Sequence, residues 1–209
     1  MARIMAVSAS NDVAFLVLQG DPATSKSRLN TVLSPQQRTR LTRYCISRIT
    51  SLVDRNLIYL LAENSMAASE AHRLEIRSIS QRGGDLNTAI AASLATPELS
   101  RYHSVTIIPN DLPFLNSLEA YLQSPTDDVC LITPDSHLTG TNLLRVPRSM
   151  ANPTFSYGPN SFFQHVRIAK AKQLEIVATP CSHAFDIDTP EDLTLAQEAF
   201  PDAELWTIL

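Results

Sequence analysis

The stretch VAFLVL at Val13–Leu18 is a continuous run of apolar residues. An apolar run of this length, without polar alternation, fits a β-strand that is buried on both faces. Three later stretches have the same character, namely LIYLLA at Leu57–Ala62, VTII at Val105–Ile108 and VCLI at Val129–Ile132. Buried strands separated by helical patterns predict βαβ units, and so an α/β protein with a mostly parallel sheet.

Helical patterns lie between and after these strands. The best marked begins at Ser34-Pro35, where a capping serine precedes a proline and Gln37 follows three residues after the serine. Further helices are expected at Asn87–Leu94, after Pro113, at Ser161–Lys172, and after Pro190 with Thr189 as its cap. Residues 139–160 hold two of the five glycines and three of the thirteen prolines, which favours a binding loop or small insertion within one domain.

Composition excludes several classes of protein. Hydrophobic residues make up 44% of the 209 residues, which is enough for a full core and argues against a disordered chain. With 17 basic and 21 acidic residues, the chain lacks the positive charge of a general nucleic-acid binder. No apolar run reaches the roughly 18 residues of a membrane span, and Met1–Ser10 is too short for a signal peptide. Three scattered cysteines without a C-x-x-C pair predict reduced, mostly buried thiols in a cytoplasmic protein.

The segment from Gly20 to Leu29 follows the first buried strand, where open α/β sheets place their ligand loops. It nearly matches the phosphate-binding pattern G-x-x-x-x-G-K-[ST], but Ser25 replaces the second glycine and Pro22 removes a backbone N–H. A loop that directs Lys26 and Arg28 at a triphosphate is therefore favoured over a true P-loop and over a plain solvated turn.

Acidic residues follow two other strand-like segments. Asp111 comes directly after VTII, where its carboxylate could hold a hard cation such as Mg²⁺ or could cap a following helix. Asp186 and Asp188 alternate around Ile187, so an extended backbone points both carboxylates to one face. Two carboxylates on one face repel each other unless a cation or proton lies between them, which favours a metal site. Capping of the last helix by Asp188 or Thr189 is the alternative.

Two further segments offer small residues and hydroxyls. Gly140-Thr141-Asn142 is one, and the stretch from Tyr157 through Gly158 to Ser161 is the other. Backbone N–H groups of such turns, together with a hydroxyl at a helix start, can form an anion pocket. Ser161 is expected to serve both as the helix cap and as an anion ligand.

In this order, the segments resemble the 2-phospho-L-lactate guanylyltransferases of coenzyme F-420 biosynthesis, from about Phe15 to Leu193. That family is similar to the wider group of nucleotide-diphospho-sugar-transferase-like enzymes, which includes the molybdenum-cofactor guanylyltransferases. The matching pieces are K-S-R-L (Lys26–Leu29), L-S-P (Leu33–Pro35), D-L-N (Asp85–Asn87), D-L-P (Asp111–Pro113), P-D-x-H-x-x-G-T-N (Pro134–Asn142), Y-G-P-x-S-F (Tyr157–Phe162), His165 and D-I-D-T-P-E-D-L (Asp186–Leu193).

The resemblance implies one three-layer α/β/α nucleotidyltransferase domain over residues 1–209, with an acceptor-binding loop region at about 134–162. It implies transfer of GMP from GTP to the phosphate of 2-phospho-L-lactate, phosphoenolpyruvate or 3-phosphoglycerate, with release of pyrophosphate. A downstream transferase of the same pathway would take the product. A nucleotidyltransferase with another base or acceptor, and a non-catalytic nucleotide-binding paralogue, are the alternatives.

Combined with the chemistry above, the resemblance implies a role for each candidate residue. Lys26 and Arg28 would neutralise the triphosphate and the leaving pyrophosphate. Asp111, Asp186 and Asp188 would hold Mg²⁺. The phospho-acid would be held by Thr141, Asn142, Gly158 and Ser161, and Asn87 would contact the nucleotide.

The chain departs from the pattern of these relatives at three places. Leu18-Gln19-Gly20 stands where a lysine is usual, Ser136 where an arginine is common, and Asn160 where glycine is common. Loss of two cations near an anionic substrate is expected to weaken binding or to change the choice of acceptor.

Overall fold

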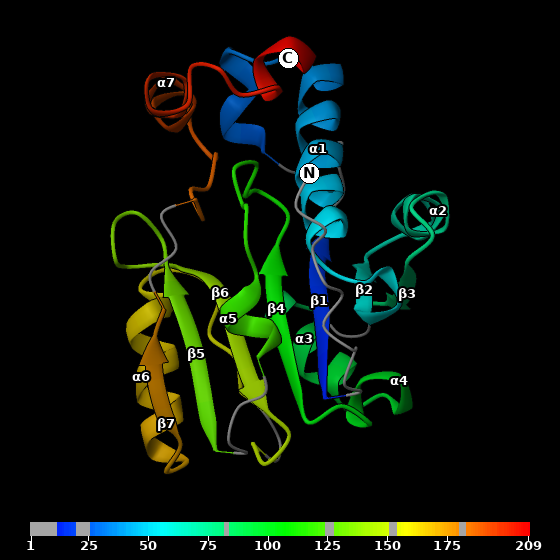
Figure 1. The fold of residues 1–209 in the computed structure, drawn as a ribbon, viewed down its shortest axis with the longest axis vertical. Helices are drawn as coiled ribbons and strands as arrows, with labels where there is room; N and C mark the ends of the chain where they lie inside the picture. The colour runs from blue at the N-terminus through cyan, green and yellow to red at the C-terminus, as the bar shows by residue number, and fades with distance from the viewer. Residues whose placement is uncertain (1–11, 20–25, 82–83, 124–127, 151–153, 180–182) are drawn as a thin grey trace, which may run out of the picture.

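The structure, a computed structural model, describes residues 12–19, 26–81, 84–123, 128–150, 154–179 and 183–209. Seven strands of these segments form one sheet in the order β3-β2-β1-β4-β6-β5-β7, with helices packed around it (Figure 1). The strands are β1 (Val13–Gln19), β2 (Ile58–Ala62), β3 (Arg77–Ser80), β4 (Ser104–Pro109), β5 (Val129–Pro134), β6 (Thr141–Pro147) and β7 (Glu175–Ala178). The expected α/β fold with a mostly parallel sheet is confirmed, and within this sheet only β6 runs antiparallel to its neighbours β4 and β5.

The helices begin close to where the capping signals place them. They are α1 (Pro35–Leu52), α2 (Ser65–Arg73), α3 (Leu86–Leu94), α4 (Pro97–Ser100), α5 (Glu119–Leu122), α6 (Ser161–Ala171), α7 (Pro190–Ala199) and α8 (Leu205–Ile208), with short 3-10 turns η1 (Ser27–Thr31) and η2 (Arg55–Leu57). The Ser34 hydroxyl accepts from the Gln37 backbone N–H, and the Gln37 side chain accepts from the Ser34 backbone N–H. This reciprocal pair fixes the start of α1.

Two predictions about chain organisation are wrong. No helix follows Pro113 directly; residues 112–118 form turns and irregular backbone, and the next helix is the four-residue α5. Residues 139–160 are not simply a loop, because they include β6, which is buried along its whole length inside the sheet. The sequence of this strand, TNLLRVP, includes polar residues, so it does not form the continuous apolar run by which the other buried strands were predicted.

Arg145 shows how a charged residue is accommodated within β6. Its side chain is 2% exposed, and its Nη1 donates to the backbone carbonyls of Ala120, Tyr121 and Gln123 at 3.5, 3.5 and 3.0 Å. These carbonyls belong to α5 and its C-terminal end, so the guanidinium ties that helix to the sheet. These hydrogen bonds offset part of the cost of burying the charge, while the buried Nε has no partner among the described residues.

Two groups of buried apolar residues support the fold. The larger surrounds the sheet and includes all of β1 except the polar Gln19. The smaller lies where η1, α1, α7 and α8 meet, and consists of Leu29, Leu33, Leu41, Cys45, Phe114, Ile187, Ala196 and Leu205. Figure 1 shows α1, α7 and the C-terminal end together above the sheet edge at which β1, β4 and β5 end. The second group therefore anchors the segments that surround this edge.

Some predictions concern residues outside the described segments. These are the glycine-start loop Gly20–Ser25, Met1–Ser10 and Cys181. Cys45 and Cys130 are buried free thiols, as expected. In the part of the chain that is described, no helix has the length and apolar character needed to cross a membrane.

Replacing Arg145 with methionine tests its structural role. The substitution keeps much of the side-chain volume but leaves three carbonyls, one of them in a buried hydrogen bond, without this donor, so we expect a loss of about 2–4 kcal/mol in unfolding free energy. Urea denaturation measures this change, with the exposed Arg148→Met as the control. Equal, small effects for the two substitutions would contradict the assignment.

Candidate active site

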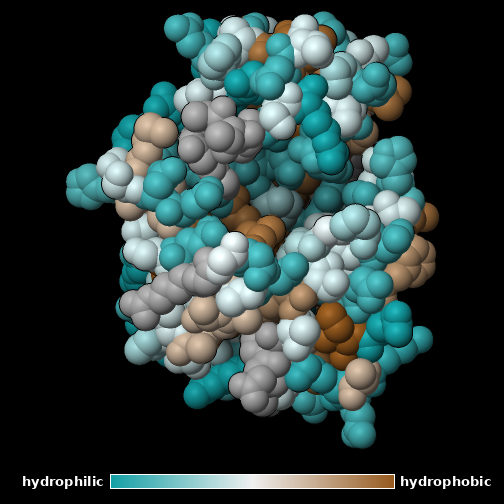
Figure 2. Space-filling view, turned by 180° about the vertical axis from the view of Figure 1, so that it is seen from behind, coloured by the Kyte–Doolittle hydropathy of each residue, from teal (hydrophilic) through white to brown (hydrophobic). Residues whose placement is uncertain are grey.

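A cavity of about 850 Å³ opens at the edge where the parallel strands end. Its walls come from the ends of β1 and β4, the start of β6, the start of α6 and the segment before α7. Figure 2 shows the surface hollowed at the height of this edge, with mainly hydrophilic residues around the hollow. The predicted site residues that line the cavity are Arg28, Asp111, Thr141, Asn142, Gly158, Ser161, Asp186 and Asp188; Lys26 and Asn87 are not among the lining residues.

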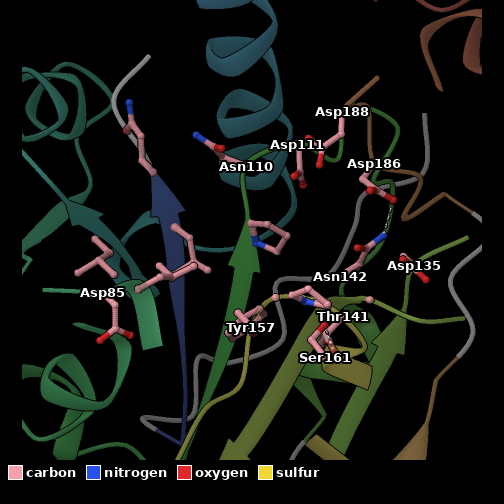
Figure 3. A pocket seen from close by; sticks show the side chains of 18 of the residues that line it. Asp85, Asn110, Asp111, Asp135, Thr141, Asn142, Tyr157, Ser161, Asp186 and Asp188 are labelled. Atoms are coloured by element: carbon pink, nitrogen blue, oxygen red, sulfur yellow. Dashed lines mark hydrogen bonds between the residues drawn. The ribbon is translucent and has the colours of Figure 1, made fainter. Parts of the chain in front are cut away.

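Three carboxylates gather at one end of this cavity, with Asp85 at the other end (Figure 3). The gathering is produced by the backbone, because the Ile187 N–H donates to the Asp111 carbonyl at 3.1 Å. The Ile187 side chain is fully buried in the smaller apolar group, so Asp186 and Asp188 on either side of it turn toward the cavity. The expected alternation around Ile187 is therefore observed.

Asp111 has an unusual environment. Its Oδ1 is buried and has no hydrogen-bond partner among the described residues. Burial raises the pKa of this carboxyl to about 7, against the opposing effect of the Lys26 ammonium, and the charges of Asp188 and Asp186 raise it further. The capping alternative for Asp111 is wrong, since no helix begins after it. The Asp111 carboxylate, which lines the cavity, is thus placed to interact with a ligand bound there.

The helix-capping alternative for the second acidic segment is correct only for Thr189. The Thr189 hydroxyl accepts from the Asp192 N–H, while the Asp192 carboxylate accepts from the backbone N–H groups of Asp188 and Thr189. The Asp188 side chain takes no part in this cap and is 44% exposed. Burial raises the pKa of Asp186, and a hydrogen bond from Asn142 lowers it.

Lys26 differs from its expected position. Its backbone is left-handed, with φ 56°, and its side chain is only 4% exposed. Its Nζ donates to the Ile187 carbonyl at 2.8 Å and lies 3.9 Å from Asp188 Oδ1. In this structure the ammonium supports the acidic cluster from behind instead of facing the cavity, which follows from the attraction of nearby carboxylates for a partly buried cation.

The lining residues carry an excess of negative charge. Arg28 is the single basic residue among those described, against the acidic residues Glu63, Asp85, Asp111, Asp135, Asp186 and Asp188. No group of three or more acidic, histidine or cysteine side chains in the described segments is gathered closely enough to hold a metal by itself. A metal at this site would therefore take fewer protein ligands, with the remaining positions filled by water or substrate oxygens, as Mg²⁺ commonly does.

Hydroxyl groups form the other functional part of the cavity. Thr141 begins β6 and Ser161 begins α6, and the Ser161 hydroxyl donates to Thr141 Oγ1 at 3.2 Å. The prediction that Ser161 caps this helix is wrong, because Asn160 occupies the cap position, with φ 58°. Asparagine adopts this left-handed conformation more readily than most residues, so its presence where glycine is common is accommodated.

The backbone at the start of α6 is largely satisfied. The Ser161 N–H donates to the Gly158 carbonyl and the Phe162 N–H to the Thr139 carbonyl, both at about 3 Å. Gly158 has φ +133°, a conformation that favours glycine. The N–H groups of Ser161 and Phe162 are therefore used within the chain, and the hydroxyls of Thr141 and Ser161 are the polar groups that these two residues offer at the cavity wall.

Two asparagines serve mainly to position other groups. The Asn87 side chain donates to the Tyr157 carbonyl at 3.1 Å and accepts from the Tyr157 N–H at 2.7 Å, which holds the turn before Gly158. The Asn142 amide donates to the Ala184 carbonyl at 2.7 Å and to Asp186 at 3.0 Å (Figure 3). Asn142 thus orients one of the clustered carboxylates.

Sequence reasoning missed some of the lining residues as individual site candidates. Gln19 ends β1, is 4% exposed, and has an Oε1 without a partner in the described residues. Asn110 and Asp85 line the cavity beside the predicted residues, and Asp85 caps α3. Position at a strand end is a sequence signal that identifies Gln19 and Asn110.

Comparison with known proteins gives a consistent relationship. A family model described as "Guanylyl transferase CofC like" matches residues 16–196. A phosphoenolpyruvate guanylyltransferase of Rubrobacter xylanophilus is 30% identical over 178 residues, covering 81% of this chain and 85% of that protein. A 2-phospho-L-lactate guanylyltransferase of Methanosphaera stadtmanae is 32% identical over 178 residues, covering 81% of this chain and 76% of that protein.

Solved structures show the same fold. One is a protein from Desulfovibrio desulfuricans assigned as a nucleotide-diphospho-sugar transferase, with a TM-score of 0.73, 17% identity, and coverage of 94% of this chain and 93% of that one. Another is a cytidylyltransferase from Leptospira borgpetersenii, with a TM-score of 0.61, 10% identity, and coverage of 94% and 92%. At these identities the likeness concerns the fold alone.

Gly140→Ala tests the turn that leads into Thr141. A Cβ at this position would lie 2.6 Å from Asp135 Oδ2, and the Asp135 carboxylate accepts from the Thr139 N–H at 2.8 Å. We expect a loss of about 1–2 kcal/mol in unfolding free energy because one of these contacts must give way. Thermal unfolding measures it against Gly84→Ala, whose added Cβ meets nothing within 4 Å. A neutral Gly140→Ala would contradict this account.

The pH dependence of stability should report on His165, whose side chain is 3% exposed. Burial lowers its pKa to about 4 from the ordinary 6.5, so between these values the unfolded chain binds more protons than the folded chain. The His165 contribution is complete above pH 6.5 and falls toward pH 4, by up to about 3 kcal/mol.

Denaturation curves at several pH values, for the wild type and His165→Asn, measure this contribution. The difference between the two proteins isolates His165, because Asp111 titrates in both. A difference that is constant from pH 4 to 6.5 would contradict the expectation.

Proposed function

The chain belongs to the guanylyl transferase CofC-like family of nucleotidyltransferases, and we propose that it transfers GMP from GTP to the phosphate of a three-carbon phospho-acid in coenzyme F-420 biosynthesis. The acceptor is phosphoenolpyruvate, 2-phospho-L-lactate or 3-phosphoglycerate, and pyrophosphate is released. The observation that carries this assignment is one cavity with clustered carboxylates and a pair of buried hydroxyls on its walls. A downstream transferase that accepts the product is the proposed partner.

The reaction requires positioning more than proton transfer. An oxygen of the acceptor phosphate attacks the α-phosphorus of GTP, and the bond to the β-phosphate oxygen breaks. The attacking phosphate is already anionic at neutral pH, so the chain needs no general base. Arg28, which lines the cavity, is proposed to interact with the triphosphate and with the charge that develops on pyrophosphate.

A divalent cation, proposed to be Mg²⁺, fits the residues of the site. The cavity is acidic, so a triphosphate would meet repulsion there unless cations accompany it. Asp111 has a buried oxygen without a partner in the described segments, and Asp186 and Asp188 lie on the same side of the cavity. One or two of these three carboxylates would hold the ion, with water or substrate oxygens completing its coordination. When bound, the cation would neutralise phosphate charge as a Lewis acid.

The substrates are proposed to occupy different parts of the cavity. The phospho-acid would bind at Thr141, Gly158 and Ser161, with Asn142 orienting Asp186 beside it. The nucleotide would extend toward Asp85, and Asn87 would act on it through the Tyr157 turn that its side chain holds. Gln19, at the end of β1 where relatives are expected to carry a nearby lysine, lines the cavity as an uncharged polar group.

A pyrophosphate-release assay with Mg²⁺ and GTP tests the proposal. Each of the three phospho-acids is offered in turn, with the downstream transferase added if the diphosphate product is unstable. Release with one acid identifies the acceptor. No pyrophosphate release with any of the three acids, in folded protein that binds GTP, would favour a non-catalytic paralogue. Stronger competition by CTP or ATP would favour another nucleotide substrate.

Asp111→Asn separates catalysis from folding. The change removes a buried charge without changing the side-chain shape, so we expect turnover to fall about 100-fold or more while stability is unchanged or raised. Initial rates and thermal unfolding are measured on the same preparations, with the exposed Asp54→Asn as a control. Retained turnover together with a loss of stability would assign Asp111 a structural role.

A further inference from the structure

His165 lies next to the hydroxyl pair, and the reaction described above gives it no role. It belongs to α6, and its ring is buried against Tyr157, with centroids 4.8 Å apart in an edge-on arrangement. Both ring nitrogens have polar neighbours. Nδ1 lies 3.0 Å from Thr141 Oγ1, and Nε2 accepts from the Ser156 backbone N–H at 3.1 Å.

These contacts determine where the ring carries its proton. A backbone N–H can only donate, so Nε2 must be the acceptor nitrogen and carries no hydrogen. Burial keeps the pKa of His165 low, at about 4, so the ring is neutral at pH 7. The single ring hydrogen is therefore on Nδ1 and is donated to Thr141 Oγ1.

The donated hydrogen has a consequence for the neighbouring hydroxyls. Thr141 and Ser161 carry one hydroxyl hydrogen each, and their oxygens share one hydrogen bond at 3.2 Å. Because His165 donates to Thr141, only one of these two hydrogens is used within the pair. Whichever hydroxyl donates to the other, the second hydrogen remains for an acceptor in the cavity that both residues line.

We propose that His165 is a positioning residue that makes the Thr141–Ser161 pair a hydrogen-bond donor to an anionic oxygen of the phospho-acid. This inference rests on the proposed function, since that function supplies the phospho-acid. A ring that only filled space would need neither the Ser156 nor the Thr141 contact. Three hydrogen bonds run in series from the Ser156 N–H through His165 to the Thr141–Ser161 pair. The series leaves one hydroxyl hydrogen at the cavity, where an anion requires a donor.

Two substitutions of nearly equal size reverse or retain this polarity. In His165→Asn the amide can still donate to Thr141, so we expect the KM for the phospho-acid to stay within about threefold of wild type. In His165→Asp, assayed at pH 8, the ionised carboxylate can only accept. Thr141 then donates to the carboxylate and Ser161 donates to Thr141, so no hydroxyl hydrogen remains for the phospho-acid. We expect the KM for the phospho-acid to rise about 10- to 100-fold, with the KM for GTP unchanged.

A double substitution separates this effect from general damage to the fold. With Thr141→Val in the background, the hydroxyl that receives the His165 hydrogen is gone. The Asn and Asp variants at position 165 should then differ by less than about threefold in the KM for the phospho-acid. A persistent large difference, or a rise in the KM for GTP equal to that for the acid, would overturn the proposal.

The tautomer can be measured without turnover. Long-range ¹H–¹⁵N correlation spectra of the ¹⁵N-histidine-labelled full chain distinguish a protonated Nδ1 from a protonated Nε2. We expect His165 to be neutral with the hydrogen on Nδ1 at pH 7, and a hydrogen on Nε2 would overturn the inference. If no phospho-acid supports pyrophosphate release, the proposed function fails while this spectrum still decides the hydrogen-bond polarity.

Discussion

The peptide backbone of Ile187 is the connection on which the site depends. Its N–H donates to the Asp111 carbonyl, its carbonyl accepts from Lys26 Nζ, and its side chain is buried in the apolar group around η1, α1, α7 and α8. Three segments far apart in the sequence are joined at this one residue. Because Ile187 is fixed by apolar burial, the two aspartates beside it are held next to Asp111 despite their mutual repulsion.

The second constraint is charge. A cavity lined by several acids and, among the described residues, one arginine attracts cations and repels a bare triphosphate. Lys26 compensates part of the negative charge from behind the acidic cluster, yet burial still raises the pKa of Asp111 to about 7, and one oxygen of this carboxylate has no partner in the described segments. The proposed role of Thr141, Ser161 and His165 is the opposite one, that of a neutral hydrogen-bond donor to an anion. The cavity therefore offers different chemistry to the cation–nucleotide and to the acceptor.

Local signals in the sequence predicted much of this arrangement. The apolar runs located β1, β2, β4 and β5, and the capping residues located the starts of α1 and α7. The strand β6 was missed because Arg145 reads as a surface residue, and only the carbonyls at the end of α5 make its burial acceptable. Lys26 was predicted to touch substrate because its loop follows a buried strand, and Asn87 because its D-L-N segment resembles that of the guanylyltransferases. Their long-range partners, Ile187 and Tyr157, are set by tertiary structure that no local pattern contains.

The central claim is that the acidic cluster assembled by Ile187 accepts a nucleotide only together with a divalent cation. Calorimetric titration of GTP into the full chain, once with Mg²⁺ and once with EDTA, tests it most directly. GTP is expected to bind at least about tenfold more tightly with Mg²⁺, because the cation removes the repulsion between phosphates and carboxylates. Equal affinity in EDTA would show that the carboxylates do not face the nucleotide, and would contradict the account.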